Sequence, residues 1–454
     1  GIVTARRFNN GFFLQAANDD GDPATSDAIF VFTGAAPPAE AAVGNRVRVT
    51  ATVDEFVPAS NPNQLSITEL VSVERVDVLD TGDALPAPVE LTAAELSPAA
   101  TPATLERFEA MRVRVAGAVA VSPAGGTIDE DDALSFTDGV FHVVLPGVPR
   151  PFREPGIGVL DAFPIPAGKQ PPRFDTNPER LMIRSRGQIG AAPLAVDVGA
   201  QLTDLAGVLD YNSGTWALLP DPATPPTVSG GMTPRAVEDA APEDVTVAGF
   251  NLLRLFDEIA DGNGAPTIKP DALDRRLTKA ARAICDYLKA PDILGVVEVE
   301  NLRVLGLLAE RINATCPRAP AYAPYLVEGN DVGGIDVGFL VATREVAPGT
   351  PRVAVQDVTQ FGKDATFANP DGTTSLLNDR PPLLLRAVVN HANGARFPLT
   401  VIANHLRSLN DMDALTPGPN GWSTDGERVR AKRAAQAAYL AGLVQQFQQD
   451  DPAE

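Results

Sequence analysis

The first 84 residues alternate between apolar and polar positions in short runs that end at turn residues. The clearest run is residues 46–53 (RVRVTATV), in which every second side chain is valine or alanine. Such alternation is typical of a strand with one solvent-facing side. Further strands are predicted at residues 11–15, 28–32 and within 65–76. Together they predict a small β-rich module, a barrel or a sandwich, over residues 1–84.

A similar alternation returns at residues 111–119 and 201–209. Short glycine-x-aromatic stretches accompany these runs, at Gly11, Gly139 and Gly214. We interpret the pattern as a weak internal repeat, with a second β-rich module at residues 105–220. The alternative is that unrelated alternating strands look alike.

The pattern changes after residues 221–244, a segment rich in Pro, Gly, Ser and Ala that we interpret as a linker. From there to residue 454, apolar runs of strand length alternate with apolar positions at helical spacing, which predicts an α/β domain. Strands are predicted at 245–250, 293–297, 335–341, 383–389 and 399–403, and helices at 273–288, 302–312 and 427–446. The fold class is therefore multidomain, with β modules followed by an α/β domain.

Cys285 and Cys316 are the two cysteines of the chain. Their number alone is compatible with one disulfide or with two buried thiols. Cys285 lies near the end of one predicted helix and Cys316 just past the end of the next. If the preceding strands are parallel neighbours, the two helices run the same way and their ends are adjacent. This placement favours a disulfide.

Charge and composition limit the classes of function. The net charge is −21, with 37 basic and 58 acidic residues, and such a field repels polyanions at long range. This argues against a protein that coats nucleic acid, but not against a metal-dependent enzyme. No apolar run is long enough to span a bilayer. The chain begins at Gly1 without a methionine, as a processed chain would, and we expect a secreted or extracellular protein, with the periplasm or cell surface as alternatives.

Polar residues stand at several predicted strand ends of the α/β domain. Glu298 directly follows the buried run 293–297, and a carboxylate there is costly to desolvate unless a cation or a donor meets it. Glu298 and Asn251 offer the oxygen ligands that Mg²⁺ or Mn²⁺ prefers. Arg380 offers a donor pair that matches phosphate, and His405 titrates near neutrality.

Each of these residues also has a structural interpretation. Asn251 alone is more often a turn residue, Arg380 can simply pair with Asp379, and His405 can be a satisfied buried histidine. Glu300 is more often a solvated carboxylate at a helix start. A basic cluster at residues 428–433, early in the last predicted helix, opposes the helix dipole, so solvent or a bound anion would relieve it.

Taken together, the segments resemble the endonuclease/exonuclease/phosphatase superfamily, which has the DNase I-like fold. They are most similar to large secreted bacterial nucleases in which small OB-like β modules precede such a domain. The matching segments are residues 247–257 (VAGFNLLRLFD), 291–301 (PDILGVVEVEN), 333–340 (GGIDVGFL), 378–383 (NDRPPL), 404–408 (NHLRS) and 433–440 (RAAQAAYL). The looser OB-like match rests on residues 10–15, 22–32 and 207–220.

The resemblance implies a four-layer α/β sandwich and a role for each matched residue. Glu298 would be the main metal carboxylate, Asn251 a polar ligand near the metal and phosphate, and His405 the general acid. Arg380 and Asn404 would contact the substrate phosphate, and Asp336 would be a supporting acidic residue. Val297 stands where family members usually have Gln, which removes one polar neighbour of the site.

The family site is completed by an Asp-x-Asn after a later strand and an Asp-His near the C-terminus, and neither follows the helix at 427–446. The expectation is therefore a truncated catalytic domain that has little nuclease activity by itself. The leading hypothesis for the whole protein is an extracellular nuclease acting on DNA, or on RNA. The alternatives are a phosphoesterase acting on a phospholipid or inositol phosphate head group, and a non-catalytic surface- or nucleic-acid-binding protein.

Two acidic loops, residues 18–22 and 129–132, are candidate Ca²⁺ sites. Neither has the spacing of an EF-hand, so the alternative is a solvated turn. The expected cofactor is thus Mg²⁺ or Mn²⁺, with Ca²⁺ as a further candidate. The sequence does not predict an oligomeric state.

Overall fold

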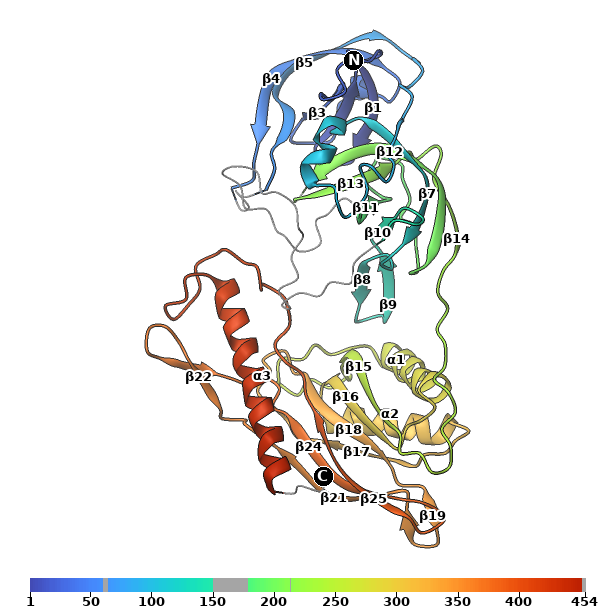
Figure 1. Cartoon of the computed structure of the whole chain (residues 1–454), viewed down its shortest axis with the longest axis vertical. Helices are drawn as coiled ribbons and strands as arrows, with labels where there is room; N and C mark the ends of the chain where they lie inside the picture. The colour runs from blue at the N-terminus through green and yellow to red at the C-terminus, as the bar shows by residue number, and fades with distance from the viewer. Residues whose placement is uncertain (60–63, 150–178, 213, 451–454) are drawn as a thin grey trace. The chain divides into compact units, whose positions relative to one another are not determined.

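The computed structural model describes residues 1–59, 64–149, 179–212 and 214–450. The chain forms two compact units, unit 1 from Gly1–Ile128 with Ser135–Thr233 and unit 2 from Asp129–Leu134 with Pro234–Glu454 (Figure 1). The division at Thr233 falls inside the predicted linker. The described structure is mostly β, with several sheets and a few helices.

Unit 1 begins with a closed five-stranded barrel. Its strands are β1 (Ile2–Arg7), β2 (Gly11–Gln15), β3 (Ala28–Phe32), β4 (Arg46–Phe56) and β5 (Ile67–Asp80). They follow the order β1-β2-β3-β5-β4, and β3 pairs with β5 in parallel while the other pairs are antiparallel. Val3, Phe12, Val31 and Val47 fill the interior. The prediction of a small β module is confirmed, although β1 was not predicted.

A second ring of strands has the same order. The strands are β7 (Arg112–Ala120), β10 (Val140–Val144), β11 (Leu181–Arg184), β12 (Ala200–Asn212) and β13 (Thr215–Pro220). The pairings β7–β10, β10–β11, β12–β13 and β12–β7 are antiparallel, and β11–β13 is parallel. β6 (Val89–Glu90) and β14 (Thr227–Gly230) extend the sheet at its two ends. A short hairpin, β8 (Gly126–Asp129) and β9 (Leu134–Thr137), lies between β7 and β10.

The two rings therefore repeat one pairing scheme, in which β7 corresponds to β1 and β12 to β4. The recurring alternation in the sequence marks this repeat only in part, because the run at 111–119 occupies the first strand position and the run at 46–53 the fourth. Gly11 begins β2 and Gly139 directly precedes β10, so these two glycines hold corresponding places.

An apolar seam joins the rings within unit 1. Ala5, Phe13 and Phe30 of the first ring pack with Ala110, Val208 and Leu219, which lie before β7 and in β12 and β13. Arg7, at the end of β1, forms an ion pair with Asp210 of β12 at 3.4 Å. The outward side chains of β1, β2 and β3 are thus partly covered by the second ring.

Unit 2 contains two sheets that pack face to face. The first has the order β15 (Val247–Leu255), β16 (Ile293–Val299), β18 (Asp336–Ala342) and β17 (Tyr322–Leu326). The second has the order β21 (Val353–Gln360), β24 (Leu383–Asn390) and β25 (Arg396–Ala403). Ile293, Val337 and Phe339 of the first sheet share a core with Leu383, Leu385 and Val389 of the second.

Helices lie on both outer sides of this pair of sheets (Figure 1). α1 (Pro270–Arg282), continued by η3 (Ala283–Tyr287), and α2 (Leu302–Thr315) share an apolar core with β15, β16 and β18. α3 (Asp425–Asp450) contacts the second sheet, where Phe447 meets Phe361 and lies 5.2 Å from the guanidinium of Arg386. The remaining strands form two short hairpins: β19 (Glu345–Ala347) with β20 (Thr350–Pro351), and β22 (Thr366–Ala368) with β23 (Thr374–Leu376).

The predicted strand–helix–strand–helix order is present in unit 2, and β15 and β16 pair in parallel. The apolar run at 245–250 suggested a buried strand, but this interpretation is wrong, because β15 is an edge strand whose Val247, Gly249 and Asn251 are exposed. The predicted disulfide Cys285–Cys316 is confirmed, and it ties the end of η3 to the end of α2. No helix among the described residues combines the length and apolar character needed to cross a bilayer.

The basic cluster at the start of α3 does not need a bound anion. Arg428 pairs with Asp425 and Lys432 with Asp379. Arg430 and Arg433 donate to the carbonyl oxygens of Met412 and Arg407. Folding of the loops before α3 therefore supplies the counter-charges and acceptors that the sequence did not reveal.

Candidate functional site

The topology of unit 2 brings the predicted strand-end residues to one end of the two sheets. β15 and β16 are parallel, so their carboxyl ends, which carry Asn251 and Glu298, lie together. β18 is antiparallel to β16 and starts at that end with Asp336. In the second sheet, Leu383 of β24 pairs with Ala403 of β25, so Arg380 precedes one strand and His405 follows the other at a shared end.

Glu298 sits at a local distortion of β16. Its φ is +62°, and the register with β18 shifts between Val297 and Val299. The neighbouring strand is distorted at the same level, since Leu253 and Arg254 have φ of +54° and +56°. A non-glycine residue in the left-handed region costs on the order of 1–3 kcal/mol and is frequent at functional sites. The bulge re-aims the Glu298 side chain relative to a regular strand.

Both oxygens of the Glu298 carboxylate accept hydrogen bonds from β15. Asn251 Nδ2 donates to Oε1 at 2.8 Å, and the backbone N–H of Arg254 donates to Oε2 at 3.1 Å. Asn251 Oδ1 in turn accepts the N–H of Leu253 at 2.7 Å, which fixes the orientation of the amide. The carboxylate is thereby held in one position while its side chain remains 17% exposed.

His405 faces the same carboxylate. Its Nε2 lies 3.7 Å from Glu298 Oε1, whereas Nδ1 is buried and has no hydrogen-bond partner in the described part of the chain. Burial and then the Arg380 guanidinium lower the pKa of His405, and Glu298 and Asp331 act in the opposite direction. The imidazole is therefore neutral at pH 7, and an anion bound beside it would raise its pKa again.

Arg380 supports the segment that carries His405. Its Nη1 donates to Asp331 Oδ2 at 2.6 Å, its Nη2 to the carbonyl of Leu406 at 3.0 Å, and its Nε to the carbonyl of His405 at 3.4 Å. The structural alternative for Arg380, a pair with Asp379, is wrong, because Asp379 pairs with Lys432. Arg380 therefore orients the loop after β25, and its role as a phosphate contact stays a prediction.

Asp336 lies beside the loop that carries Arg380. Its Oδ1 accepts the N–H of Gly329 at 2.7 Å, and a Cβ at Gly329 would come within 2.7 Å of both Asp336 Oδ1 and Pro381. Burial, followed by repulsion from Glu328 and Asp331, raises the pKa of Asp336 to about 7. Among the described residues, the hydrogen bond to Asp336 comes from Gly329, not from the Glu298–His405 group.

Asp336→Asn is expected to stabilise unit 2 at alkaline pH. The raised pKa means that the folded state holds the Asp336 proton more tightly than the unfolded state, so this contribution is complete below pH 3.8 and is lost as the pH rises through about 7. Asparagine does not titrate, so the variant does not lose stability as the pH rises. Compared with the wild type, its free energy of unfolding should be higher by about a few kcal/mol at pH 8 and nearly unchanged at pH 3.5. Urea titrations in EDTA at the two pH values measure this, with exposed Asp364→Asn as the control. Equal shifts at both pH values would contradict it.

The sequence predictions for Asn404 and Glu300 have different outcomes. Asn404 is half-buried directly after β25, and its phosphate role stays a prediction. The interpretation of Glu300 as a solvated carboxylate is wrong: it is 1% exposed and accepts the N–H of Asp257 at 2.7 Å and Asn263 Nδ2 at 3.3 Å. Glu300 therefore anchors the loop between β15 and α1.

Three further residues shape the site: Asp331 and Gln436, which the sequence did not single out as site residues, and Lys432 of the basic cluster. Asp331 pairs with Arg380, as described above. Lys432 of α3 donates to Asp379 Oδ1 at 2.7 Å. Gln436 of α3 accepts the N–H of Arg407 at 2.9 Å and donates to the carbonyl of Leu377 at 2.8 Å. α3 thus links the Arg380 loop to the His405 loop, and the basic cluster was the one sequence signal for it.

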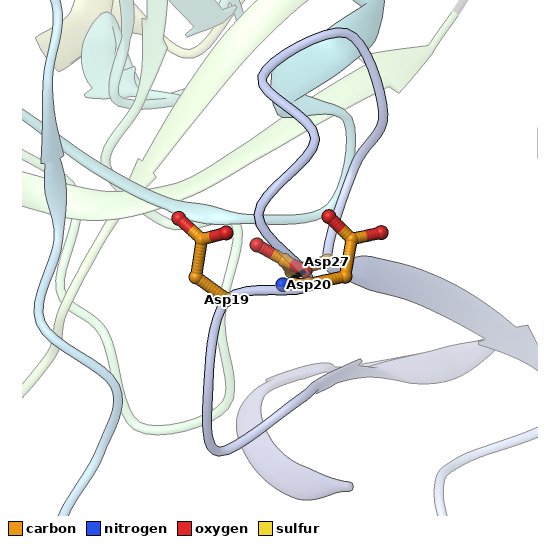
Figure 2. A group of neighbouring side chains, drawn as sticks. All are labelled: Asp19, Asp20 and Asp27. Carbon is orange, nitrogen blue, oxygen red and sulfur yellow. Dashed lines mark hydrogen bonds between the residues drawn. The ribbon is translucent and has the colours of Figure 1, made fainter.

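The acidic loop 18–22 brings carboxylates together. Figure 2 shows Asp19, Asp20 and Asp27, whose oxygens come within 4.8 Å of one another. Asp19 and Asp20 accept the backbone N–H groups of Gly21 and Asp22, and Asp27 accepts the N–H of Asp20. These bonds explain the grouping as a turn. In the second loop, Asp129 accepts the N–H of Asp132 at 3.1 Å. Ca²⁺ binding at either loop stays a prediction.

Comparison with known protein families matches residues 88–230 to a domain of unknown function (DUF8508). The match contains the whole second ring, from β6 to β14, and covers about a third of the chain. No curated protein matches the chain.

Proposed function

We propose that unit 2 is a metal-dependent phosphodiesterase domain of the endonuclease/exonuclease/phosphatase type and that the protein is an extracellular nuclease. The observation that carries the proposal is the grouping of Glu298, Asn251 and His405, which come from three different strand ends. The strained backbone at Glu298 also supports a functional role for this residue, because strain of this kind is frequent at functional sites. Two packed sheets with helices on both outer sides agree with a DNase I-like sandwich.

The donor set fits a hard divalent ion. Glu298 offers a carboxylate that is fixed and still reachable from solvent, a ligand that Mg²⁺ and Mn²⁺ prefer. Asn251 turns its Nδ2 toward this carboxylate and its Oδ1 toward the N–H of Leu253, so it would reach the ion through Oδ1 only after its amide turns over. When bound, such an ion would polarise a phosphate oxygen and lower the pKa of a coordinated water.

The protein's own residues would then position and protonate the substrate. Asn251 and the Arg254 N–H hold the Glu298 carboxylate in place. His405 would donate a proton to the leaving oxygen. The negative charge of a phosphodiester beside it would raise the pKa of the imidazole, against the burial that lowers it. Arg380 keeps His405 facing Glu298 by holding the carbonyls of His405 and Leu406.

The two rings of unit 1 agree with OB-like modules, because a five-stranded barrel with the order 1-2-3-5-4 and a parallel 3–5 pair occurs twice. OB barrels commonly bind oligonucleotides or oligosaccharides through the face of their second and third strands. In the first ring this face is partly covered by the seam. We therefore assign the rings a positioning role rather than a catalytic one.

The disulfide is compatible with an oxidising compartment, which agrees with secretion. The chemistry of the site does not distinguish a nucleic acid from a phospholipid or inositol phosphate head group. The test is hydrolysis by the whole protein of plasmid DNA, RNA and phosphatidylinositol vesicles, with Mg²⁺ or Mn²⁺ and with EDTA. Cleavage of DNA or RNA that EDTA abolishes is the expected result. Cleavage of the lipid alone would replace the nuclease by a lipid phosphoesterase, and no cleavage of any substrate would contradict catalysis.

A further inference from the structure

A cavity of about 390 Å³ lies in unit 1 beside the seam between the two rings. Its walls come from the ends of β1, β3 and β4, the first half of β5, and β12. Aromatic side chains form much of the apolar wall: Phe30 is buried, whereas Phe32 and Phe56 are 38% and 42% exposed. The cavity does not share residues with the Glu298 site, which belongs to unit 2.

A buried acceptor without a partner lines this cavity. Asp210 is 4% exposed, and its Oδ1 pairs with Arg7 at 3.4 Å, but its Oδ2 has no hydrogen-bond partner in the described part of the chain. Asn10 Oδ1, in the turn between β1 and β2, is likewise buried without a donor among the described residues. Buried acceptors of this kind cost about 1–3 kcal/mol each unless a donor reaches them. Among the described residues, no N–H or O–H group of the cavity wall meets either of these two oxygens.

The charge of the cavity is also unbalanced. Asp54, Glu69 and Asp210 face one cation, Arg7, whose guanidinium already lies 5.3 Å from the centre of the Phe30 ring. Glu69 is 5% exposed. Burial and then Asp54 raise the pKa of Glu69, and burial raises that of Asp210 although Arg7 and Arg184 lower it. Carboxylates respond in this way when they lack a full counter-charge.

These features exclude several kinds of ligand. The carboxylates of this cavity do not form a compact metal site. Among the described residues, the three acidic side chains whose oxygens lie within 4.8 Å of one another are Asp19, Asp20 and Asp27, which are not part of the cavity. A phosphate would meet two uncompensated carboxylates. A neutral sugar would supply donors but would leave the repulsion between Asp54 and Glu69 unrelieved.

We propose that this cavity binds a small organic cation, an aliphatic chain ending in an amine or guanidinium group. The cation would donate N–H bonds to Asp210 Oδ2 and Asn10 Oδ1 and supply the charge missing beside Glu69. Its methylene groups would pack on Phe32 and Phe56, whose ring faces attract cations. A free polyamine and a lysine or arginine side chain of a peptide share this chemistry.

Isothermal titration calorimetry on the 454-residue chain tests the proposal, with agmatine, spermidine and an arginine-containing tripeptide as probes. We expect a Kd below about 1 mM for at least one of them. Glu69→Gln should weaken that binding about tenfold or more, and Phe56→Ala several-fold. Glu74→Gln, an exposed glutamate on the same strand, is the matched control and should bind as the wild type does.

Three results would overturn the proposal: no heat from any cationic probe, tighter binding of maltotriose or of a thymidine decamer, or equal affinities for the Glu69→Gln and Glu74→Gln variants. Circular dichroism shows whether each variant folds, and Phe56→Ala removes a ring that is already half exposed. Agmatine should bind Glu298→Gln as it does the wild type. The experiment therefore tests the cation-binding proposal separately from the nuclease proposal.

Discussion

Replacing Glu298 by glutamine is expected to lower metal-dependent phosphodiester hydrolysis by the whole protein by a factor of about 10³ or more. The carboxylate would be the main charged ligand of the ion, and a metal contributes several kcal/mol to the stabilisation of charge in the transition state. Glutamine has the same shape and keeps one acceptor, for Asn251 Nδ2, but it loses the acceptor for the N–H of Arg254. The change therefore removes the charge and one hydrogen bond at a partly exposed position.

Initial rates on plasmid DNA at saturating Mg²⁺ measure this effect. The matched control is Glu310→Gln, which removes an equal charge from an exposed position on α2 and should leave the rate unchanged. If Glu298→Gln and Glu310→Gln hydrolyse DNA at the same rate, then Glu298 has no catalytic role and its strained backbone needs another explanation.

Arg352→Leu is expected to destabilise unit 2 by about 3–5 kcal/mol, the largest stability effect that we anticipate. Arg352 is 5% exposed and donates to both oxygens of Asp292, from Nε and Nη2, each at 2.8 Å. Its Nη1 donates to the carbonyl of Asn390 at 3.1 Å and lies 3.0 Å from His391 Nδ1. The leucine variant would leave the buried Asp292 carboxylate with only the exposed Arg344, 4.0 Å away, as a counter-ion.

Urea unfolding of unit 2, followed by circular dichroism, measures the loss. Arg318→Leu breaks an exposed pair with Asp239 and should cost less than about 1 kcal/mol. The double variant Asp292→Leu/Arg352→Leu should recover much of the stability, because it leaves no buried charge unpaired. A single variant as stable as the Arg318 control would contradict the account.

The Arg352–Asp292 ion pair also determines the direction in which the stability of unit 2 changes with pH. Although burial alone would raise the pKa of Asp292, hydrogen bonds from Arg352 and Thr246 bring it below the ordinary value of 3.8. The contribution of Asp292 to stability is therefore present above pH 3.8 and is lost as the pH falls below that value. Arg352→Leu should lack this acid-sensitive component.

Local patterning was sufficient to predict most elements of unit 2. Strands β16, β18, β24 and β25 and all three α-helices lie where the apolar runs and the helical spacing placed them. Parallel pairing of β15 and β16 brings Asn251 and Glu298 to one edge. His405 follows a strand of the second sheet, and its place in the same site was expected from the resemblance. β17 and β21 were missed because their sequences, YAPYL and VAVQDVTQ, carry a proline or polar residues that obscure a strand.

Features that depend on long-range contacts could not be predicted. The burial of Glu300 depends on a loop more than 35 residues earlier in the chain, which Asp257 and Asn263 contribute. Arg380 pairs with Asp331 rather than with its sequence neighbour Asp379, which is taken by Lys432 of α3. The left-handed backbone at Glu298 has no signature in residue type, since glutamate gives no hint of a positive φ.

Mn²⁺ binding by the 454-residue chain tests the central claim most directly, because it requires only Glu298 and its neighbours and not a complete reaction. Electron paramagnetic resonance of free Mn²⁺ gives the number and affinity of sites in the wild type, Glu298→Gln and Glu310→Gln. We predict that Glu298→Gln loses one site or binds it at least about tenfold more weakly, and that Glu310→Gln matches the wild type. Any site at Asp19, Asp20 and Asp27 would persist in all three proteins. Identical Mn²⁺ titrations for Glu298→Gln and the wild type would contradict the assignment of this carboxylate to a metal.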